Sequence, residues 1–155
     1  MTSITAYSDG SCNIKTREGG VGILLLIDNQ EKHISIGYSN TTISRMEMRG
    51  VLFSIKEFPI NETGSLTIYS DSQFVVNSFN KGWLKTWIMQ DFVDRKNSDI
   101  WKEIVSELKL RHNMKFSIIH TRGHQKDLTN EINYGNAVAD ILASYKNFKT
   151  FIKDF

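Results

Sequence analysis

The chain has 155 residues, of which 40% are hydrophobic and 23% charged, a composition typical of one globular domain and not of a membrane-spanning or disordered chain. Its formal net charge of +2 neither requires nor excludes a polyanionic partner, so any nucleic-acid surface must come from local clusters of lysine and arginine. The single cysteine excludes an internal disulfide, and the N-terminus lacks the pattern of a secretion signal. We therefore expect a cytoplasmic monomer with no membrane segment.

Three strands joined by short links are expected at the start of the chain. Residues 4–12 begin with β-branched and aromatic side chains, residues 21–28 are strongly apolar, and residues 32–38 alternate apolar with polar. Asp28, Asn29 and Gln30 favour a tight turn between the second and third strands. The pattern predicts an antiparallel meander.

Helices and strands alternate in the rest of the chain. The first helix is expected to open at Ser44, because Ser44 and Glu47 have the spacing of a capping box. The further elements expected are a strand ending at Asp71, a helix after it, an irregular stretch at 82–96, a helix at 97–111, a strand at 115–120 and a helix from Asn133. The order βββαβααβα predicts an α/β fold with a mixed five-stranded sheet flanked by helices.

The domain is expected to span residues 1–148, followed by a short tail at 149–155. The tail is basic and aromatic and has no reliable periodicity. It is expected either to dock on the domain or to serve as a recruitment peptide for another protein.

Two of the predicted strands end in an aspartate, Asp9 and Asp71. If the strands are neighbours in one sheet, the two carboxylates lie side by side and raise each other's pKa unless a cation separates them. Hard divalent metals prefer such oxygen ligands, so the pair is typical of a metal site. Taken singly, each aspartate is also compatible with a turn or a helix cap.

Glu47 and Asp140 are candidates to join this pair. Glu47 lies in the first turn of a predicted helix, where it is equally explained as a capping residue. Asp140 lies among the small residues of the segment 135–143, which predicts close packing and is an unusual setting for a solvated surface charge. Four carboxylates converge if both helices pack near the ends of the two strands.

Five short motifs, in this order, resemble type 1 ribonuclease H. They are Ser8-Asp9-Gly10-Ser11-Cys12, Arg45-Met46-Glu47, Ser70-Asp71-Ser72-Gln73, Thr121-Arg122-Gly123-His124 and Asn136-Ala137-Val138-Ala139-Asp140. Each motif is weak alone, but the series covers nearly the whole chain and the element order matches the RNase H-like fold. The resemblance implies an endonuclease that hydrolyses the RNA strand of RNA–DNA hybrids, leaving a 5′-phosphate and a 3′-hydroxyl.

The resemblance also implies a set of site residues. Two Mg²⁺ ions, for which Mn²⁺ can substitute, would be held by Asp9, Glu47, Asp71 and Asp140. His124 matches a family histidine that aids proton transfer or product release, although an exposed loop histidine is the plain alternative. The implied substrate-binding residues are Cys12, Asn13, Ser44, Gln73 and Asn136, with Thr42 and Arg45 at a phosphate of the DNA strand.

Residues 82–96 match the family's basic protrusion, which grips the hybrid. Trp83 and Trp87 would stack on sugar rings, and Lys85 would be one of the basic side chains that contact phosphates. Because tryptophan is more often a core residue, we expect only one of the pair, Trp83, to be exposed.

The sequence departs from the family pattern next to Arg45, where Ile43 and Ser44 replace a pair of asparagines. Ile43 has no side-chain donor, so we expect a modest and unusually salt-sensitive affinity for the hybrid. Two alternatives stay open: another two-metal DNA nuclease of the same fold, of the resolvase or transposase kind, and a non-catalytic hybrid-binding module.

Overall fold

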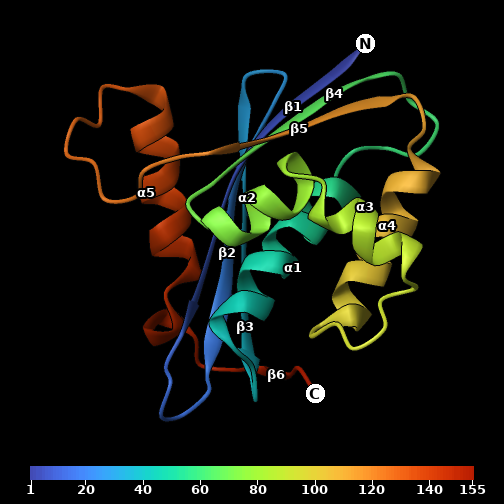
Figure 1. Ribbon diagram of the computed structural model, residues 1–155. Helices are drawn as coiled ribbons and strands as arrows, with labels where there is room; N and C mark the ends of the chain where they lie inside the picture. Colours follow the sequence, from blue (N-terminus) through green and yellow to red (C-terminus); the bar gives the residue numbers. More distant parts are fainter.

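A sheet runs through the middle of the molecule and helices cover both of its faces (Figure 1). The computed structural model describes residues 1–155. Its elements are β1 (Thr2–Cys12), β2 (Gly19–Ile27), β3 (Gln30–Ser39), α1 (Ile43–Lys56), β4 (Gly64–Ser70), α2 (Gln73–Asn80), α3 (Trp83–Met89), α4 (Ser98–Leu110), β5 (Met114–His120), α5 (Glu131–Ala143), a 3₁₀ turn (Tyr145–Asn147) and β6 (Ile152–Lys153). None of the helices combines the length and the apolar character needed to span a membrane.

The sheet is mixed, as the sequence predicts, and has the strand order β5-β4-β1-β2-β3-β6. β1, β2 and β3 form the expected antiparallel meander, while β4 pairs parallel with both β1 and β5. The sixth strand is an addition to the five expected: β6 is two residues long and pairs parallel with the end of β3. The element order otherwise confirms the predicted α/β fold.

The β2–β3 hairpin confirms the tight turn expected at residues 28–30. Ile27 pairs with Gln30, which leaves only Asp28 and Asn29 in the turn. Both have positive φ, 51° and 63°, as a type I′ turn requires, and these two residue types tolerate that conformation best after glycine. This turn keeps the strands in the register that buries the apolar side chains of β2.

The two faces of the sheet meet different helices. On one face α1 and α2 pack on the sheet and α4 packs on α1, and the large core between them includes Ile4 and Ala6 of β1. On the other face α5 lies alone, and Tyr7 packs there with Leu24 and Ala139 (Figure 1). The alternation along β1 follows from the period of two in a strand, so one strand supplies both cores.

The first helix starts earlier than the sequence predicts. Thr42 is the N-cap: its backbone is extended and its hydroxyl accepts a hydrogen bond from the Arg45 amide at 3.3 Å. Ser44 is then the second helical residue and Glu47 the fifth, so the proposed capping box at Ser44 and Glu47 is wrong. Glu47 is free to serve another purpose.

The stretch expected to be irregular, 82–96, contains helix α3. Gly82, at φ 76°, precedes the helix, and Leu84 and Trp87 lie one turn apart on its buried side. Two inward-facing apolar residues are too few for a clear periodic signal, which is why the sequence did not reveal the helix.

Candidate active site

The register of two parallel strands places the first two carboxylates. Tyr7 of β1 pairs with Tyr69 of β4, and Ser8 pairs with Ser70. Asp9 and Asp71 are the next residues on each chain, so they reach the same end of the sheet together. The structure thus brings the two strand-end aspartates side by side, as the sequence predicts.

Glu47 reaches this point because α1 lies close against the end of β1. A Cβ atom at Gly10 would lie 2.7 Å from the amide nitrogen of Glu47, a separation that real Cβ atoms do not show. Only glycine permits this approach of helix to strand. The Asp-Gly pair in β1 therefore supplies one ligand and the space for another.

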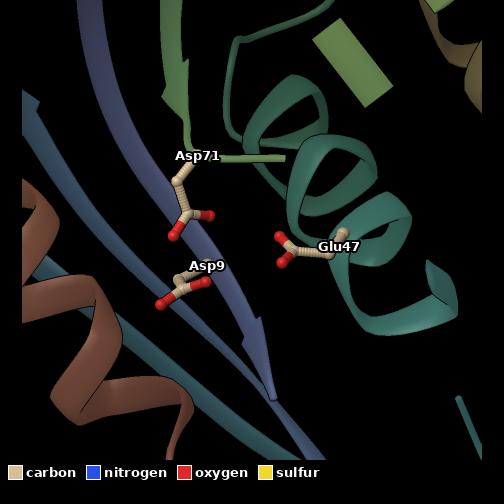
Figure 2. A group of neighbouring side chains, drawn as sticks. All are labelled: Asp9, Glu47 and Asp71. Carbon is tan, nitrogen blue, oxygen red and sulfur yellow. The ribbon is translucent and has the colours of Figure 1, made fainter. Parts of the chain in front are cut away.

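The three carboxylates form a cluster at the end of the sheet. Asp9, Glu47 and Asp71 each offer an oxygen, and these oxygens lie within 4.8 Å of one another. Figure 2 shows the three side chains pointing toward a common centre from β1, α1 and the end of β4. The spacing fits one or two small divalent cations held by carboxylates.

Asp140 approaches from the opposite face of the sheet on α5. A Cβ at Gly22 of β2 would lie 2.3 Å from the Ala139 carbonyl oxygen, and one at Gly20 would lie 2.2 Å from that of Ala143. The small residues on both surfaces let α5 pack directly on the strand, which confirms the close packing predicted for this segment. Asp140 is thereby held beside Asp9 and contributes to raising the pKa of that carboxyl.

A cleft of about 200 Å³ joins Asp9, Asp71 and Asp140 to the neighbouring loop and helix. Its lining is almost entirely polar or small. The residues around it are Ser8, Asp9, Asp71, Gly123, His124, Gln125, Asn133, Asn136, Ala137, Asp140 and Ile141. Six predicted site residues from different parts of the chain thus border this cleft or the adjoining carboxylate cluster: Asp9, Glu47, Asp71, His124, Asn136 and Asp140.

The cluster is electrostatically unfavourable without a cation. Burial, followed by repulsion from Asp71, raises the pKa of Asp9 from 3.8 to about 8. Burial, followed by repulsion from Asp9, raises the pKa of Glu47 well above its usual value, and its Oε2 has no hydrogen-bond partner. No lysine, arginine or histidine forms an ion pair with any of the four carboxylates. The donors and their charge fit divalent metal ions.

His124 lies on the loop between β5 and α5, exposed and at the edge of the cleft. The loop comes close to the carboxylates at Gly123, where a Cβ would lie 2.9 Å from Oδ2 of Asp71. Across the cleft Asn136 accepts a hydrogen bond from Thr121 at 3.2 Å, while its own amide nitrogen is buried and has no partner. His124 and Asn136 therefore both lie beside the carboxylates of the cleft.

A second depression lies beside the N-terminus of α1 and has a volume of about 440 Å³. We call it the Thr42 hollow; it is lined by Cys12, Ile14, Arg17, Thr41, Thr42 and Ile43. Burial raises the pKa of Cys12, and its thiol points to the carbonyl oxygens of Asn13 and Thr41, each at 3.6 Å. Cys12 is thus a lining residue and is not set up as a thiolate nucleophile.

The other predicted binding residues lie near these two depressions. Asn13 accepts hydrogen bonds from the amides of Lys15 and Thr16 and so orders the first loop. Ser44 lies in the first turn of α1, and Gln73 is exposed at the start of α2, two residues after Asp71.

The structure corrects the assignment of Arg45. Its side chain is only 5% exposed, and Asp99, Asp154 and Asn97 accept hydrogen bonds from all three of its guanidinium nitrogens. These are five bonds for five N–H groups, so no donor remains for a DNA phosphate. The side chain of Arg45 therefore serves to hold these three residues together.

The protrusion presents one tryptophan to solvent, as expected. Trp83 is 38% exposed, whereas Trp87 is 7% exposed and packs on Trp101 with ring centroids 5.4 Å apart. Arg95 covers the remaining face of Trp87 at 4.2 Å. Lys85 is exposed on the same helix as Trp83.

Asn133 and Gln125 border the cleft but were not predicted. Asn133 shares a face of α5 with Asn136, Ala137 and Asp140, at spacings of three, four and seven residues. This polar stripe on a helix with an otherwise small and apolar character was the available signal. Gln125 lies on an irregular loop, where no periodic signal exists.

The fold and the site together define an RNase H-like α/β domain with an acidic centre at the end of β1 and β4. The RNase H family model matches residues 1–147. The chain is 33% identical to the Ribonuclease H of Trichodesmium erythraeum, over 84% of this chain and 83% of the relative. It is 36% identical to the Ribonuclease H of Chlorobaculum parvum, over 83% of this chain and 88% of that one.

A solved structure supports the same assignment. The crystal structure of the prototype foamy virus protease-reverse transcriptase superposes with a TM-score of 0.79 at 28% identity; the match covers 97% of this chain and 21% of that one. The chain belongs to the ribonuclease H family, and it is accordingly an enzyme of the hydrolase class, an endoribonuclease.

Proposed function

We propose that this protein hydrolyses the RNA strand of RNA–DNA hybrids, leaving 5′-phosphate and 3′-hydroxyl ends, with two Mg²⁺ ions held by Asp9, Glu47, Asp71 and Asp140. The observation that carries the proposal is the carboxylate cluster: three oxygens within 4.8 Å of one another, without a cationic side chain to balance them. Bound ions would supply an activated water and charge neutralisation at the phosphate.

The carboxylates divide into a rigid and a more accessible group. Asp9 is 8% exposed and is fixed by its strand and by a hydrogen bond from the Gly10 amide at 2.8 Å. Asp140 is exposed at the cleft. We assign Asp9 as the ligand shared by the two metal positions, because it alone lies next to the other three carboxylates. Asp140 completes the position that is open to substrate.

His124 has the position of a proton carrier. It borders the same cleft as Asp71 and Asp140, and residues 124–130 of its loop are all exposed to solvent. An imidazole exchanges protons near neutral pH, so it can take or deliver the proton released as water attacks and the 3′ oxygen leaves. Mn²⁺ is expected to replace Mg²⁺ because both accept carboxylate oxygens.

The hybrid would lie across the cleft and the Thr42 hollow. The RNA strand would lie over the carboxylates, with 2′-hydroxyl contacts from Cys12, Asn13, Ser44, Gln73 and Asn136. The DNA strand would place a phosphate at Thr42, where the first turn of α1 offers free N–H groups. Trp83 and Lys85 would grip the duplex farther along, with Trp87 supporting them from the core.

The test is cleavage of one end-labelled oligonucleotide, offered as RNA–DNA hybrid, duplex RNA, duplex DNA and single-stranded RNA, with Mg²⁺ or a chelator. We expect cutting only of the hybrid RNA, dependent on Mg²⁺ and lost in Asp71→Asn. Glu62→Gln, an equivalent change at an exposed acidic residue near the N-terminus of β4, is the matched control and should cut normally.

The other outcomes separate the alternatives. Cutting of duplex DNA would support the metal site but contradict the proposed substrate, and would favour a DNA nuclease of the same fold. Binding of the hybrid without any cutting would favour a non-catalytic binding module.

A further inference from the structure

The C-terminal segment, residues 149–155, runs back along the edge of the sheet and ends against α1 (Figure 1). β6 extends the sheet beside Tyr38 and Ser39, and the amide of Asp154 donates to the Ser39 carbonyl at 2.9 Å. The side chain of Asp154 is fully buried. This segment therefore docks on the domain, which was one of the two roles that the sequence left open.

Asp154 joins the start of α1 to the residue that precedes its cap. Its carboxylate accepts hydrogen bonds from Thr41 at 2.6 Å, from Arg45 at 2.8 and 3.1 Å, and from Arg49. Thr41 is a wall of the Thr42 hollow, and Arg45 donates its backbone amide to the Thr42 hydroxyl. One buried carboxylate thus holds the residues on both sides of Thr42.

Phe155 contacts Arg17, another lining residue of the Thr42 hollow. Its ring lies under the guanidinium groups of Arg17 and Arg45, at 5.5 and 4.6 Å, and its main-chain oxygen accepts a hydrogen bond from Asn40. Arg17 also donates to the Thr41 carbonyl at 3.4 Å and is the only basic side chain lining the hollow. The ring fixes the direction in which this cation points.

We infer that Asp154 and Phe155 are positioning residues for hybrid binding: they hold Thr41, Thr42 and Arg17 in the arrangement that receives a phosphate of the DNA strand. The inference rests on the proposed function, because it presumes that a hybrid lies over the Thr42 hollow. Neither residue touches the carboxylate cluster, which α1 presents on its other side through Glu47. Their loss should therefore weaken binding and leave the chemical step unchanged.

Because Ile43 has no side-chain donor, the support that Asp154 and Phe155 give to the other donors becomes more important. With an isoleucine at the mouth of the hollow, the available donors are the Thr42 hydroxyl, the backbone amides and Arg17. Of these donors, the Thr42 hydroxyl depends on Asp154 for its orientation and Arg17 depends on Phe155. A phosphate site with few donors loses a large share of its affinity when one donor turns away.

The test uses the full chain and compares Phe155→Leu and Asp154→Asn with the wild type. Steady-state cleavage gives kcat and KM. Equilibrium binding of a labelled hybrid at several salt concentrations, in the inactive Asp71→Asn background, gives the salt dependence. Phe155 is 56% exposed, so Phe155→Leu should fold even if Asp154→Asn does not.

We expect KM to rise about threefold in Phe155→Leu, from loss of the cation–π contacts, and roughly tenfold in Asp154→Asn. We expect kcat to change little. The log–log slope of affinity against salt should fall by about 1 in Asp154→Asn, as for the loss of one phosphate contact. Phe155→Tyr, which keeps the ring, should restore the wild-type KM.

Phe151→Leu is the matched control, since it removes a ring from the same segment that faces Phe148 and not the arginines. Wild-type KM and salt slope in both test variants would overturn the inference while leaving the proposed function intact. So would an equal effect of Phe151→Leu, which would indicate general loosening of the segment. Failure of the wild type to cut hybrids would instead contradict the proposed function itself.

Discussion

Helix α1 carries buried charge on two opposite sides, and the two sides are balanced in contrasting ways. Toward β1 it presents Glu47 to Asp9 and Asp71, with no cation among them. Toward the C-terminal segment it presents Arg45 and Arg49 to Asp154, so that every charge has an opposite partner. Residues 45 and 49 lie one turn apart and residue 47 lies on the far side, as helical geometry requires.

The pKa values of Asp9 and Asp154 reflect this difference between the two sides of α1. In the carboxylate cluster, burial and like charge raise the pKa of Asp9 to about 8. At Asp154 burial also acts to raise the pKa, but hydrogen bonds from Arg45, Thr41 and Arg49 outweigh it and lower the pKa to about 2. Two buried sites therefore differ: the carboxylate cluster needs a cation, whereas the charges around Asp154 already balance one another. The first is typical of function and the second of structure.

The largest expected effect comes from Asp9→Asn, which removes the carboxylate that we propose the two metal positions share. Cleavage should fall by roughly a thousandfold or more, because a neutral amide cannot replace this ligand. Without metal the same change should stabilise the protein by roughly 2 kcal/mol at pH 7, since it removes the free-energy cost of protonating Asp9 on folding. Hybrid cleavage and urea unfolding in chelator measure the two effects, with the exposed Asp28→Asn as control.

The pH dependence of the metal-free protein follows from the same site. The pKa of Asp9 rises from 3.8 to about 8 on folding, so the folded state keeps a proton that the unfolded state loses. Stability in chelator should therefore fall as pH rises from about 4 to about 8, and Mg²⁺ should flatten that slope. Stability that rises with pH over this window would contradict the described electrostatics of the cluster.

Asp154→Asn should have the opposite effect on stability. Removing the charge leaves Arg49 without its ion-pair partner and Arg45 with only the exposed Asp99, which is expected to destabilise the protein by about 3 kcal/mol at pH 7. The folded pKa of Asp154, about 2, lies below the ordinary 3.8, so its contribution is present above about pH 4 and is lost as pH falls toward 2. Unfolding curves of wild type and variant should converge over that range.

Gly10→Ala tests the contact between the cluster and α1. The added Cβ would lie 2.7 Å from the Glu47 amide and 2.8 Å from the Met46 carbonyl carbon, so strand and helix must separate. We expect a loss of about 2 kcal/mol of stability from overpacking, together with reduced cleavage because Glu47 moves from Asp9. Ser3→Ala, at the exposed start of the same strand, is the control. Normal cleavage in Gly10→Ala would argue that Glu47 has no fixed position.

The smallest effect is expected at Asp99, the other carboxylate bound to Arg45. Its side chain is 62% exposed, so solvent screens the pair, although Arg45 lowers the pKa of Asp99. Asp99→Asn should cost about 0.5 kcal/mol in the free energy of unfolding. Comparing the loss in Asp99→Asn with the loss in Asp154→Asn measures how burial changes the stability that an ion pair with Arg45 contributes. Equal losses in the two variants would contradict the distinction drawn between the buried and exposed partners.

The sequence alone determined five of the six strands, most of the helices and the acidic centre. Asp9 and Asp71 each follow an alternating strand, and the parallel pairing of β1 with β4 makes their meeting a consequence of local pattern. The small residues around Asp140 also correctly predicted that α5 packs closely on the sheet. Such signals are readable because they repeat with the period of the strand or helix that carries them.

Only the tertiary structure decided the partners of individual side chains. Arg45 was expected at a phosphate, but it pairs with Asp154, which lies 109 positions away in the chain. The burial of Trp87 and the docking of β6 likewise depend on neighbours that are distant in sequence. Residue type indicates that a charge needs a partner, whereas the packing of distant segments selects which partner is within reach.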